Sequence, residues 1–367
     1  DAYLYYRKNA SPNNGEVTPI SYSGTTVSDG TPISIGNSNI PSGAITFDST
    51  ESKIGIGYYD GSNSDAATVN SVSPSSTNLT STNLLGLAPE AISDTATGTI
   101  NTWGSRCESS STFLGYSTSV GSEVVYEAAR ADHGIPIFDS SNNKVVIVYA
   151  DNGDSDYGKA IVGTISGSSI SYGTAVNFNA ATTTRISGTF DSNSNKVVIV
   201  YNDGGDSNAT KAIVGTVSGT SISFGAEATI TANVAGKNTT TTFDSNSNKV
   251  VAFYRDDSNS EYGTAAVGTV SGTDITFGTP VVFESASSNF YPSSSCFDTS
   301  NNKTVVVYAD AGNSSHGTSI VGTVSGTSIS FGTAVVFHAA STDDMTCDFD
   351  SGNNKVVVAY RDNAAPK

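Results

Sequence analysis

The sequence predicts an all-β fold, a single closed β-propeller of about seven four-stranded blades that spans residues 1–367. Three observations support this prediction. A repeat of just over 50 residues runs through most of the chain, and each copy carries four strand-like segments in the same order. The composition is rich in Ser, Thr, Asn and Gly, with Val and Ile as the main aliphatic residues, which favours strands and turns over helices.

The dipeptide Phe-Asp marks the repeat. It begins at Phe138, Phe190, Phe243, Phe297 and Phe349, so successive marks lie 52, 53, 54 and 52 residues apart. A regular period of this length indicates a repeat architecture in which each unit packs mainly on its neighbours.

Each repeat contains four segments, which we name strands a to d. In one complete repeat they are predicted at 186–190, 196–201, 211–217 and 221–230. Four antiparallel strands per unit and about seven units are typical of a propeller. The Phe224-Gly225 pair in the middle of strand d predicts a bulge or a close approach of another backbone.

The two ends of the chain complement each other. Residues 1–15 align without a gap with residues 303–317, so the chain begins at strand b, and residues 16–36 supply strands c and d. The C-terminal end supplies strand a at Phe349 and strand b at 355–360. We expect the N-terminal strands to join the C-terminal strands and close the ring, with one b segment to spare.

Residues 84–134 form an irregular unit. Segments 97–103 and 121–126 resemble strands, but the Phe-Asp mark is missing. The unit is therefore either an irregular blade or an insertion, and in the second case the ring has six blades.

The connections between strands differ in their variability. The a–b and c–d turns are nearly uniform and rich in Asp, Asn and Gly, which fits tight turns on a structural face. The d–a loops differ in every repeat and share the opposite face with the b–c loops. Such variation is typical of a recognition surface, and equally of solvent loops under little constraint.

The candidate ligand-binding residues come from these d–a loops. Phe290 and Tyr291, next to Pro292, are the best candidates for stacking on a sugar or a protein surface. The full set is Phe290, Tyr291, Arg130, His133, Arg185, Lys237, Asp343 and Asp344.

The first acidic b–c loop superficially resembles the calcium loops of integrin-type propeller repeats. Asp151, Asp154 and Asp156 would be the ligands, since calcium prefers oxygen donors at alternating positions. The other b–c loops depart from that pattern. The alternative is that the Asp two residues after the Tyr of strand b closes the loop by accepting backbone N–H bonds. No other cofactor is expected.

Catalytic motifs are weak in this sequence. The three histidines lie in separate repeats without zinc-site spacing, and no G-x-S-x-G sequence occurs. Asp343-Asp344 opposite Glu284 could form a glycosidase carboxylate pair, but a solvated acidic loop explains them more simply. Cys107, Cys296 and Cys347 predict three free thiols, or one disulfide with one thiol.

Charge and hydropathy exclude two classes of partner. The net charge is −17 with only 17 Lys and Arg residues, so no basic stripe is available for nucleic acid. No stretch of about 18 apolar residues occurs, so membrane insertion is not expected. The first residue is Asp1 instead of Met, which we interpret as a mature or excised segment.

The repeat pattern F-D-S-x-x-N-K-V-V-I-V-Y, followed by Y-G-x-A-I-V-G-T-V-S-G-T-S-I-S-F-G, resembles tandem repeats in proteins of large algal viruses and marine microbes. Residues 84–103 are similar to a short module in tail-fibre-like proteins of marine phages. Together these resemblances cover most of the chain. They imply a virion or extracellular setting, and no catalytic residue carries over.

These observations predict a non-enzymatic surface recognition or adhesion module, extracellular or on a virion surface. It would bind a glycan or a host surface protein, as its receptor, through the b–c and d–a loops. One alternative is a structural virion or spacer protein whose loop face contacts other virion proteins of its own assembly. A weaker alternative is a glycan-cleaving enzyme.

Overall fold

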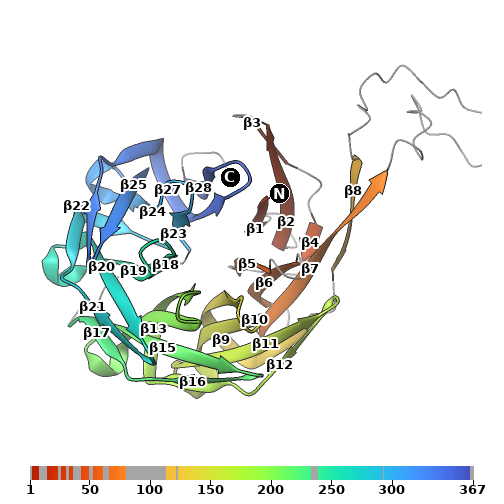
Figure 1. Cartoon of the computed structure of the whole chain (residues 1–367), viewed down its shortest axis with the longest axis horizontal. Helices are drawn as coiled ribbons and strands as arrows, with labels where there is room; N and C mark the ends of the chain where they lie inside the picture. The colour runs from red at the N-terminus through yellow and green to blue at the C-terminus, as the bar shows by residue number, and fades with distance from the viewer. Residues whose placement is uncertain are drawn as a thin grey trace, which may run out of the picture.

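The computed structural model describes residues 123–232, 239–291 and 293–363 in full, and upstream of them the backbone of eight strands between Ala2 and Val120. Apart from four 3₁₀ turns of three residues each, the regular structure in these parts of the chain is strand, so the all-β prediction is confirmed. None of the described helices is long and apolar enough to cross a membrane. Figure 1 shows small sheets that follow one another around a common centre.

One blade illustrates the repeating sheet. Its inner strand is the second half of β13 (Val176–Asp191), which pairs with β14 (Lys196–Asp203). β14 pairs with β15 (Ala209–Ser218), and β15 pairs with both β16 (Ser221–Phe224) and β17 (Ala228–Thr231). The predicted order a-b-c-d is confirmed, although strand d is interrupted after Phe224.

The described strands form five such blades. The others contain β5 (Gly43–Asp48), β6 (Lys53–Asp60), β7 (Ala66–Leu79) and β8 (Phe113–Val120); β9 (Val124–Asp139), β10 (Lys144–Asp151), β11 (Tyr157–Ser166) and β12 (Ser169–Tyr172); β18 (Thr239–Asp244), β19 (Lys249–Asp256), β20 (Tyr262–Ser271), β21 (Asp274–Phe277) and β22 (Val281–Asn289); and β23 (Ser295–Asp298), β24 (Lys303–Asp310), β25 (His316–Ser325), β26 (Ser328–Phe331) and β27 (Val335–Asp350).

Three long strands connect neighbouring blades. The first halves of β9, β13 and β27 complete the outer strand of one blade, and their second halves form the inner strand of the next. The shorter strand β22 also pairs with both β20 and β24, and these changes of partner along a continuous strand explain why the blades merge into sheets of 13 and 11 strands. At these three places the d–a connection is thus a bent strand rather than a free loop.

The ends of the chain form two partial blades. β1 (Ala2–Arg7), β2 (Gly15–Ser23), β3 (Thr26–Asp29) and β4 (Ile33–Ile35) make an N-terminal sheet in the order b-c-d. The second half of β27 and β28 (Lys355–Asp362) make a C-terminal a–b hairpin. Among the described strands no pairing joins these two parts, although Figure 1 shows the two chain ends near each other.

The irregular unit contributes to existing sheets where it is described. β8 and the first half of β9 both pair with β7, so they serve as the outer strand of the blade that contains β7. The predicted strand at 97–103 lies outside the described residues.

Neighbouring blades interlock at the glycine of strand d. A Cβ atom on Gly173 would lie 1.8 Å from the carbonyl oxygen of Thr220, and one on Gly225 would lie 1.9 Å from that of Thr273. Each threonine belongs to the c–d turn of the next blade. The predicted close approach is confirmed, and it explains why these positions are glycine.

The core lies between the blades and consists largely of b and c strands. Residues 197–201 of β14 are all 0% exposed, because strand b is covered on both faces. The Asp of each Phe-Asp pair closes the a–b turn; Asp191, for example, accepts hydrogen bonds from the N–H groups of Asn193 and Ser194, both at 2.9 Å. The turn face is structural, as the uniform sequences predicted.

Candidate functional site

The b–c loops and d–a segments lie together on one face. We call this the loop face; its described b–c loops are 152–156, 204–208, 257–261 and 311–315, and its d–a segments are 128–136, 180–186, 284–291, 293–295 and 338–345. Contacts join the two sets. The Thr183 N–H donates to the carbonyl of Asp156 at 2.8 Å, and Gly205 lies so close to Ala181 that an added Cβ would be 2.7 Å from its methyl group.

Each long strand bends on this face at a residue with left-handed backbone geometry. The φ angles are +57° at His133, +55° at Arg185 and +44° at Asp344, and the strand register shifts beside each of them. All three residues lie five positions before the Phe of Phe-Asp. Positive φ is uncommon for residues other than glycine, so three examples at the same repeat position mark a feature that the fold imposes. Equivalent positions in three blades therefore carry an imidazole, a guanidinium and a carboxylate.

His133 and Arg185 interact electrostatically. Burial, and next the positive charge of Arg185, lower the pKa of His133, while Asp132 and Asp156 oppose that change. Burial and the charge of Arg255 likewise lower the pKa of Arg185. The loop face thus brings basic groups from neighbouring blades together within a strongly acidic chain.

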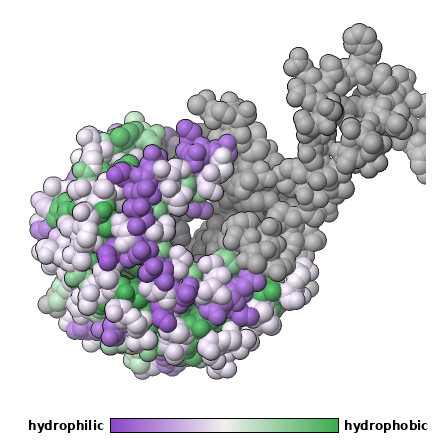
Figure 2. Space-filling view, in the orientation of Figure 1, coloured by the Kyte–Doolittle hydropathy of each residue, from purple (hydrophilic) through white to green (hydrophobic). Residues whose placement is uncertain are grey.

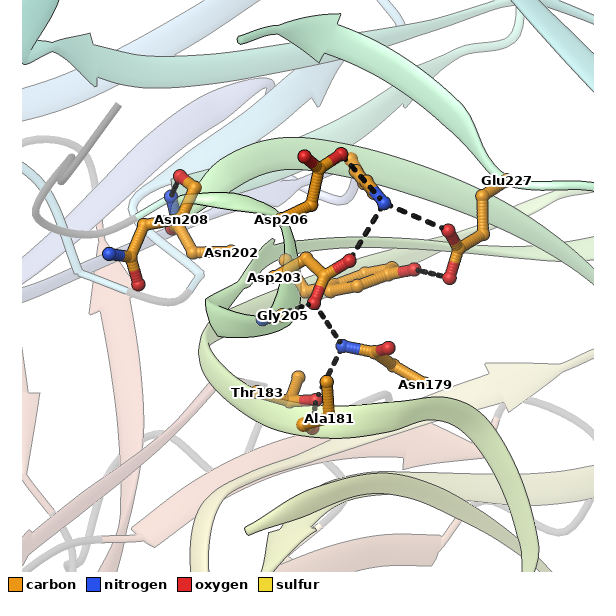
Figure 3. Close-up of polar contacts among 11 residues, drawn as sticks. Asn179, Ala181, Thr183, Asn202, Asp203, Gly205, Asp206, Asn208 and Glu227 are labelled. Carbon is orange, nitrogen blue, oxygen red and sulfur yellow. Dashed lines mark hydrogen bonds and ion pairs between the residues drawn. The ribbon is translucent and has the colours of Figure 1, made fainter. Parts of the chain in front are cut away.

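A lysine side chain lies among the carboxylates of two of the acidic b–c loops. Lys211 Nζ lies 2.7 Å from Asp203, 3.1 Å from Asp206 and 3.0 Å from Glu227. Figure 3 shows these three carboxylates gathered around one point. Burial opposes a charge here, but hydrogen bonds to these carboxylates outweigh it and raise the pKa of Lys211. Asn179, in the first half of β13, donates to Asp203 at 3.1 Å.

The same arrangement argues against the predicted calcium site. Lys159 Nζ lies 2.6 Å from Asp151 and 3.0 Å from Asp154, so an internal cation already sits between two of the three expected ligands. Asp156 instead accepts a hydrogen bond from Asn152 at 2.9 Å. No group of three or more metal-binding side chains is present among the described residues. The alternative interpretation is supported, since Asp151 accepts from the Gly153 N–H at 2.9 Å and closes its loop.

In three blades the tyrosine near the end of strand b hydrogen-bonds to a glutamate of the outer strand region. Tyr149, Tyr201 and Tyr308 are fully buried, and their hydroxyls donate to Glu127, Glu227 and Glu284 at 3.2, 2.7 and 3.1 Å respectively. Burial and these carboxylates raise the pKa of all three tyrosines. The loop face therefore rests on a rigid, hydrogen-bonded layer.

Phe290 is not the exposed platform that the sequence suggested. Its side chain is 0% exposed and packs on Phe283 and Tyr308, with ring centroids 5.8 and 6.0 Å away. An apolar ring in an extended segment turns inward whenever the core has room for it. Tyr291 is half-buried against the cluster around Cys296 and Cys347. The view in Figure 2 shows hydrophobic residues only as separate spots beside a band of hydrophilic ones.

The proposed glycosidase carboxylates have separate partners. Arg361 forms ion pairs with both Asp343 and Asp344, and Glu284 accepts the hydroxyl of Tyr308. Arg130, another candidate, is exposed and pairs with Asp132 at 3.0 Å. Lys237 lies outside the described residues.

Sequence reasoning missed the residues that organise the b–c loops. Lys159, Lys211, Glu227 and Asn179 all act there, and none was selected. A signal existed, because Lys159 and Lys211 lie 52 residues apart, one repeat, at a strand c position where the next two repeats have threonine.

No family model and no curated protein sequence matches the chain. Among solved structures, polysaccharide lyase Uly1 matches with a TM-score of 0.51 and 9% identity, covering 99% of this chain and 85% of that one. AofleA from Arthrobotrys oligospora matches with a TM-score of 0.46 and 8% identity, over 87% of this chain and 78% of its own. A point mutant of the Aleuria aurantia lectin AAL, in complex with Fucalpha1-6GlcNAc, matches with a TM-score of 0.44, 12% identity and 92% coverage of each chain. The first likeness supports the overall arrangement of the sheets.

Proposed function

We propose that this protein is a non-enzymatic surface recognition module that binds a glycan or a host surface protein through its loop face. One observation carries the proposal. His133, Arg185 and Asp344 occupy equivalent bends in three blades, where they share a left-handed backbone conformation but carry different side-chain groups. A uniform scaffold that presents varied polar side chains is suited to recognising one asymmetric ligand. We place the protein outside the cell or on a virion surface, in keeping with the repeats that it resembles.

The arrangement of carboxylates supports binding over catalysis. A glycosidase needs two carboxyl groups that face one sugar at a defined separation. Here Asp343 and Asp344 share Arg361, while Glu284 supports Tyr308. These contacts hold the carboxylates as structural and charge-balancing groups.

The proposal is tested by binding of the full chain to a glycan array and to host cells. The double variant His133→Ala with Arg185→Ala should lose at least about tenfold in affinity, because each polar contact at a desolvated site is worth roughly 1–3 kcal/mol. The matched control is Ser168→Ala with Ser192→Ala, two exposed residues in the c–d and a–b turns of the opposite face.

Two outcomes would contradict the proposal. Unchanged binding by a His133→Ala, Arg185→Ala variant whose thermal unfolding matches that of the wild type would show that these side chains take no part in recognition. A wild-type chain that binds neither glycans nor cells, with its loop face covered by neighbouring subunits in an intact particle, would favour the structural role. Mass analysis of array glycans after incubation would detect any cleavage.

A further inference from the structure

The last complete blade has an uncovered flank. Val162, Val214 and Val267 occupy the same position on strand c of three successive blades and are 0%, 0% and 1% exposed. Val321 occupies that position in the next blade and is 44% exposed. Val335, on the neighbouring outer strand, is 59% exposed, whereas its counterparts Val176 and Val281 are partly buried.

We call the space beside the strand d glycine, which a threonine carbonyl of the next blade fills, the glycine notch; no described residue of another blade fills it in this last blade. An added Cβ would meet a threonine carbonyl at 1.8 Å on Gly173, and at 1.9 Å on Gly225 and Gly278. On Gly332, the equivalent residue, the nearest atom would be the carbonyl oxygen of Val321 at 3.8 Å, within its own blade. The notch and the exposed valines together have the form of a blade–blade interface with one side absent.

We infer that the N-terminal sheet β1–β4 docks on this flank through β2 and β3, which supply strands c and d of a final blade. The C-terminal hairpin, formed by the second half of β27 and by β28, provides strands a and b but lacks c and d. The N-terminal sheet has the missing pair, and its register from Ala2↔Ile20 to Arg7↔Gly15 repeats that of Thr304↔Gly322 to Ala309↔Gly317.

The sequence of the N-terminal sheet fits the empty notch. The sequence that leads from β2 to β3 reads Ser23-Gly24-Thr25, the same pattern as in the turns whose threonines 220, 273 and 327 fill the other notches. Gly24 and Thr25 themselves lie outside the described residues. Burying the exposed valines gives the docking a favourable hydrophobic contribution.

The first test compares glycines in two notches of the full chain. If the flank is covered, Gly332→Val should lower the unfolding temperature by about 4 °C or more, as should Gly278→Val, because both would force a Cβ against a backbone carbonyl. If Gly278→Val destabilises the protein but Gly332→Val leaves the unfolding temperature unchanged, the inference is wrong.

The second test measures thiol labelling and does not depend on destabilising the fold. Val321→Cys should react with a maleimide at least about tenfold more slowly than Val282→Cys, a residue that is 40% exposed and lies on the outward side of strand d. Each rate is followed by mass spectrometry of the peptide that carries the new cysteine.

The third comparison identifies the occupant. Adding Gly24→Val, at the glycine of the Ser-Gly-Thr sequence that follows β2, should raise the labelling rate of Val321→Cys toward that of Val282→Cys. Equal rates without that change would show an open flank. Protection that appears only at concentrations where light scattering detects dimers would assign the flank to a second copy, and would overturn the inference.

Discussion

The polar residues of the b–c loops show how single side chains decide local stability. Lys211 is 8% exposed and neutralises Asp203, which is 5% exposed. Removing one partner of such a pair leaves a buried charge without compensation, which costs more than the pair contributes when intact.

We therefore expect Lys211→Met to lower the free energy of unfolding by about 3 kcal/mol in denaturant titrations. The control is Lys144→Met, since Lys144 Nζ donates to the Thr164 hydroxyl at 2.9 Å instead of a carboxylate. That change should cost less than about 1.5 kcal/mol. Equal losses would show that lysine packing, not charge compensation, is responsible.

In the blade that contains β23–β27, a lysine can be added beside the b–c loop instead of removed. Asp310 Oδ1 is buried and has no hydrogen-bond partner, and Thr318 stands where Lys159 and Lys211 stand in two other blades. Thr318→Lys should supply the missing cation and raise the free energy of unfolding by about 1 kcal/mol. Thr264→Lys is the comparison, because Arg255 already pairs with Asp257 at 2.6 Å in that loop. If Thr264→Lys alone raised the free energy of unfolding, the missing partner of Asp310 would not be a source of instability.

His133 should make the protein less stable in mild acid. Its pKa is lowered in the folded state, so the unfolded chain binds a proton more readily as the pH falls below about 6.5. Stability from this residue is therefore full above that pH and is lost as the pH falls toward the lowered pKa of the folded state.

Unfolding midpoints between about pH 7.5 and 5.5 test this expectation, because the free histidine titrates within that range. The midpoint of the wild type should fall more steeply over that range than that of His133→Gln, which cannot titrate. Parallel pH profiles for the two proteins would show that His133 does not contribute.

At the scale of elements, the inner strands of neighbouring blades hold one another through hydroxyl groups. Ser187 lies 2.8 Å from Thr239 and 2.7 Å from Thr241, and Thr240 lies 2.8 Å from Ser295. These contacts join residues about one repeat apart. The repeat period thus corresponds in space to contact between equivalent strands.

The hairpin of β7 and β8 should tolerate a shorter connection. Its pairing continues to Leu79↔Phe113, so residues 80–112 join two strand ends that already lie side by side. Replacing 80–112 with Ser-Gly-Thr should change the unfolding free energy by less than about 2 kcal/mol, because loop closure depends only weakly on length. Circular dichroism and thermal unfolding would check it, and loss of the β spectrum would show that this segment is needed for folding.

The sequence predicted where the strands lie better than it predicted which of them are continuous. The uniform Asp, Asn and Gly of the turns located strands a, b and c, because left-handed turn geometry admits few residue types. The merging of d and a into one bent strand was not predicted, since a bend at His133 or Arg185 depends on the partner strands rather than on local propensity.

For the whole molecule, the net charge of −17 should make stability depend on salt. Repulsion among exposed carboxylates destabilises the compact state, and salt screens it, whereas the partly buried Lys–Asp pairs are screened less. We expect the unfolding midpoint to rise between about 20 and 200 mM NaCl, a range over which the screening length shortens severalfold. A falling midpoint would mean that the ion pairs of the b–c loops outweigh the general repulsion.

Residue patterns alone were enough to predict the all-β class, the repeat, the order of strands a to d and the separation of a uniform turn face from a varied loop face. Periodicity and turn chemistry are local properties, so they can be read without coordinates. Three findings required the folded arrangement: Phe290 packs inward, Lys159 occupies the expected calcium site, and Val321 is exposed where its counterparts are buried. Each of these depends on which neighbour lies across a blade interface, and contacts between residues about one repeat apart are fixed by packing rather than by local pattern.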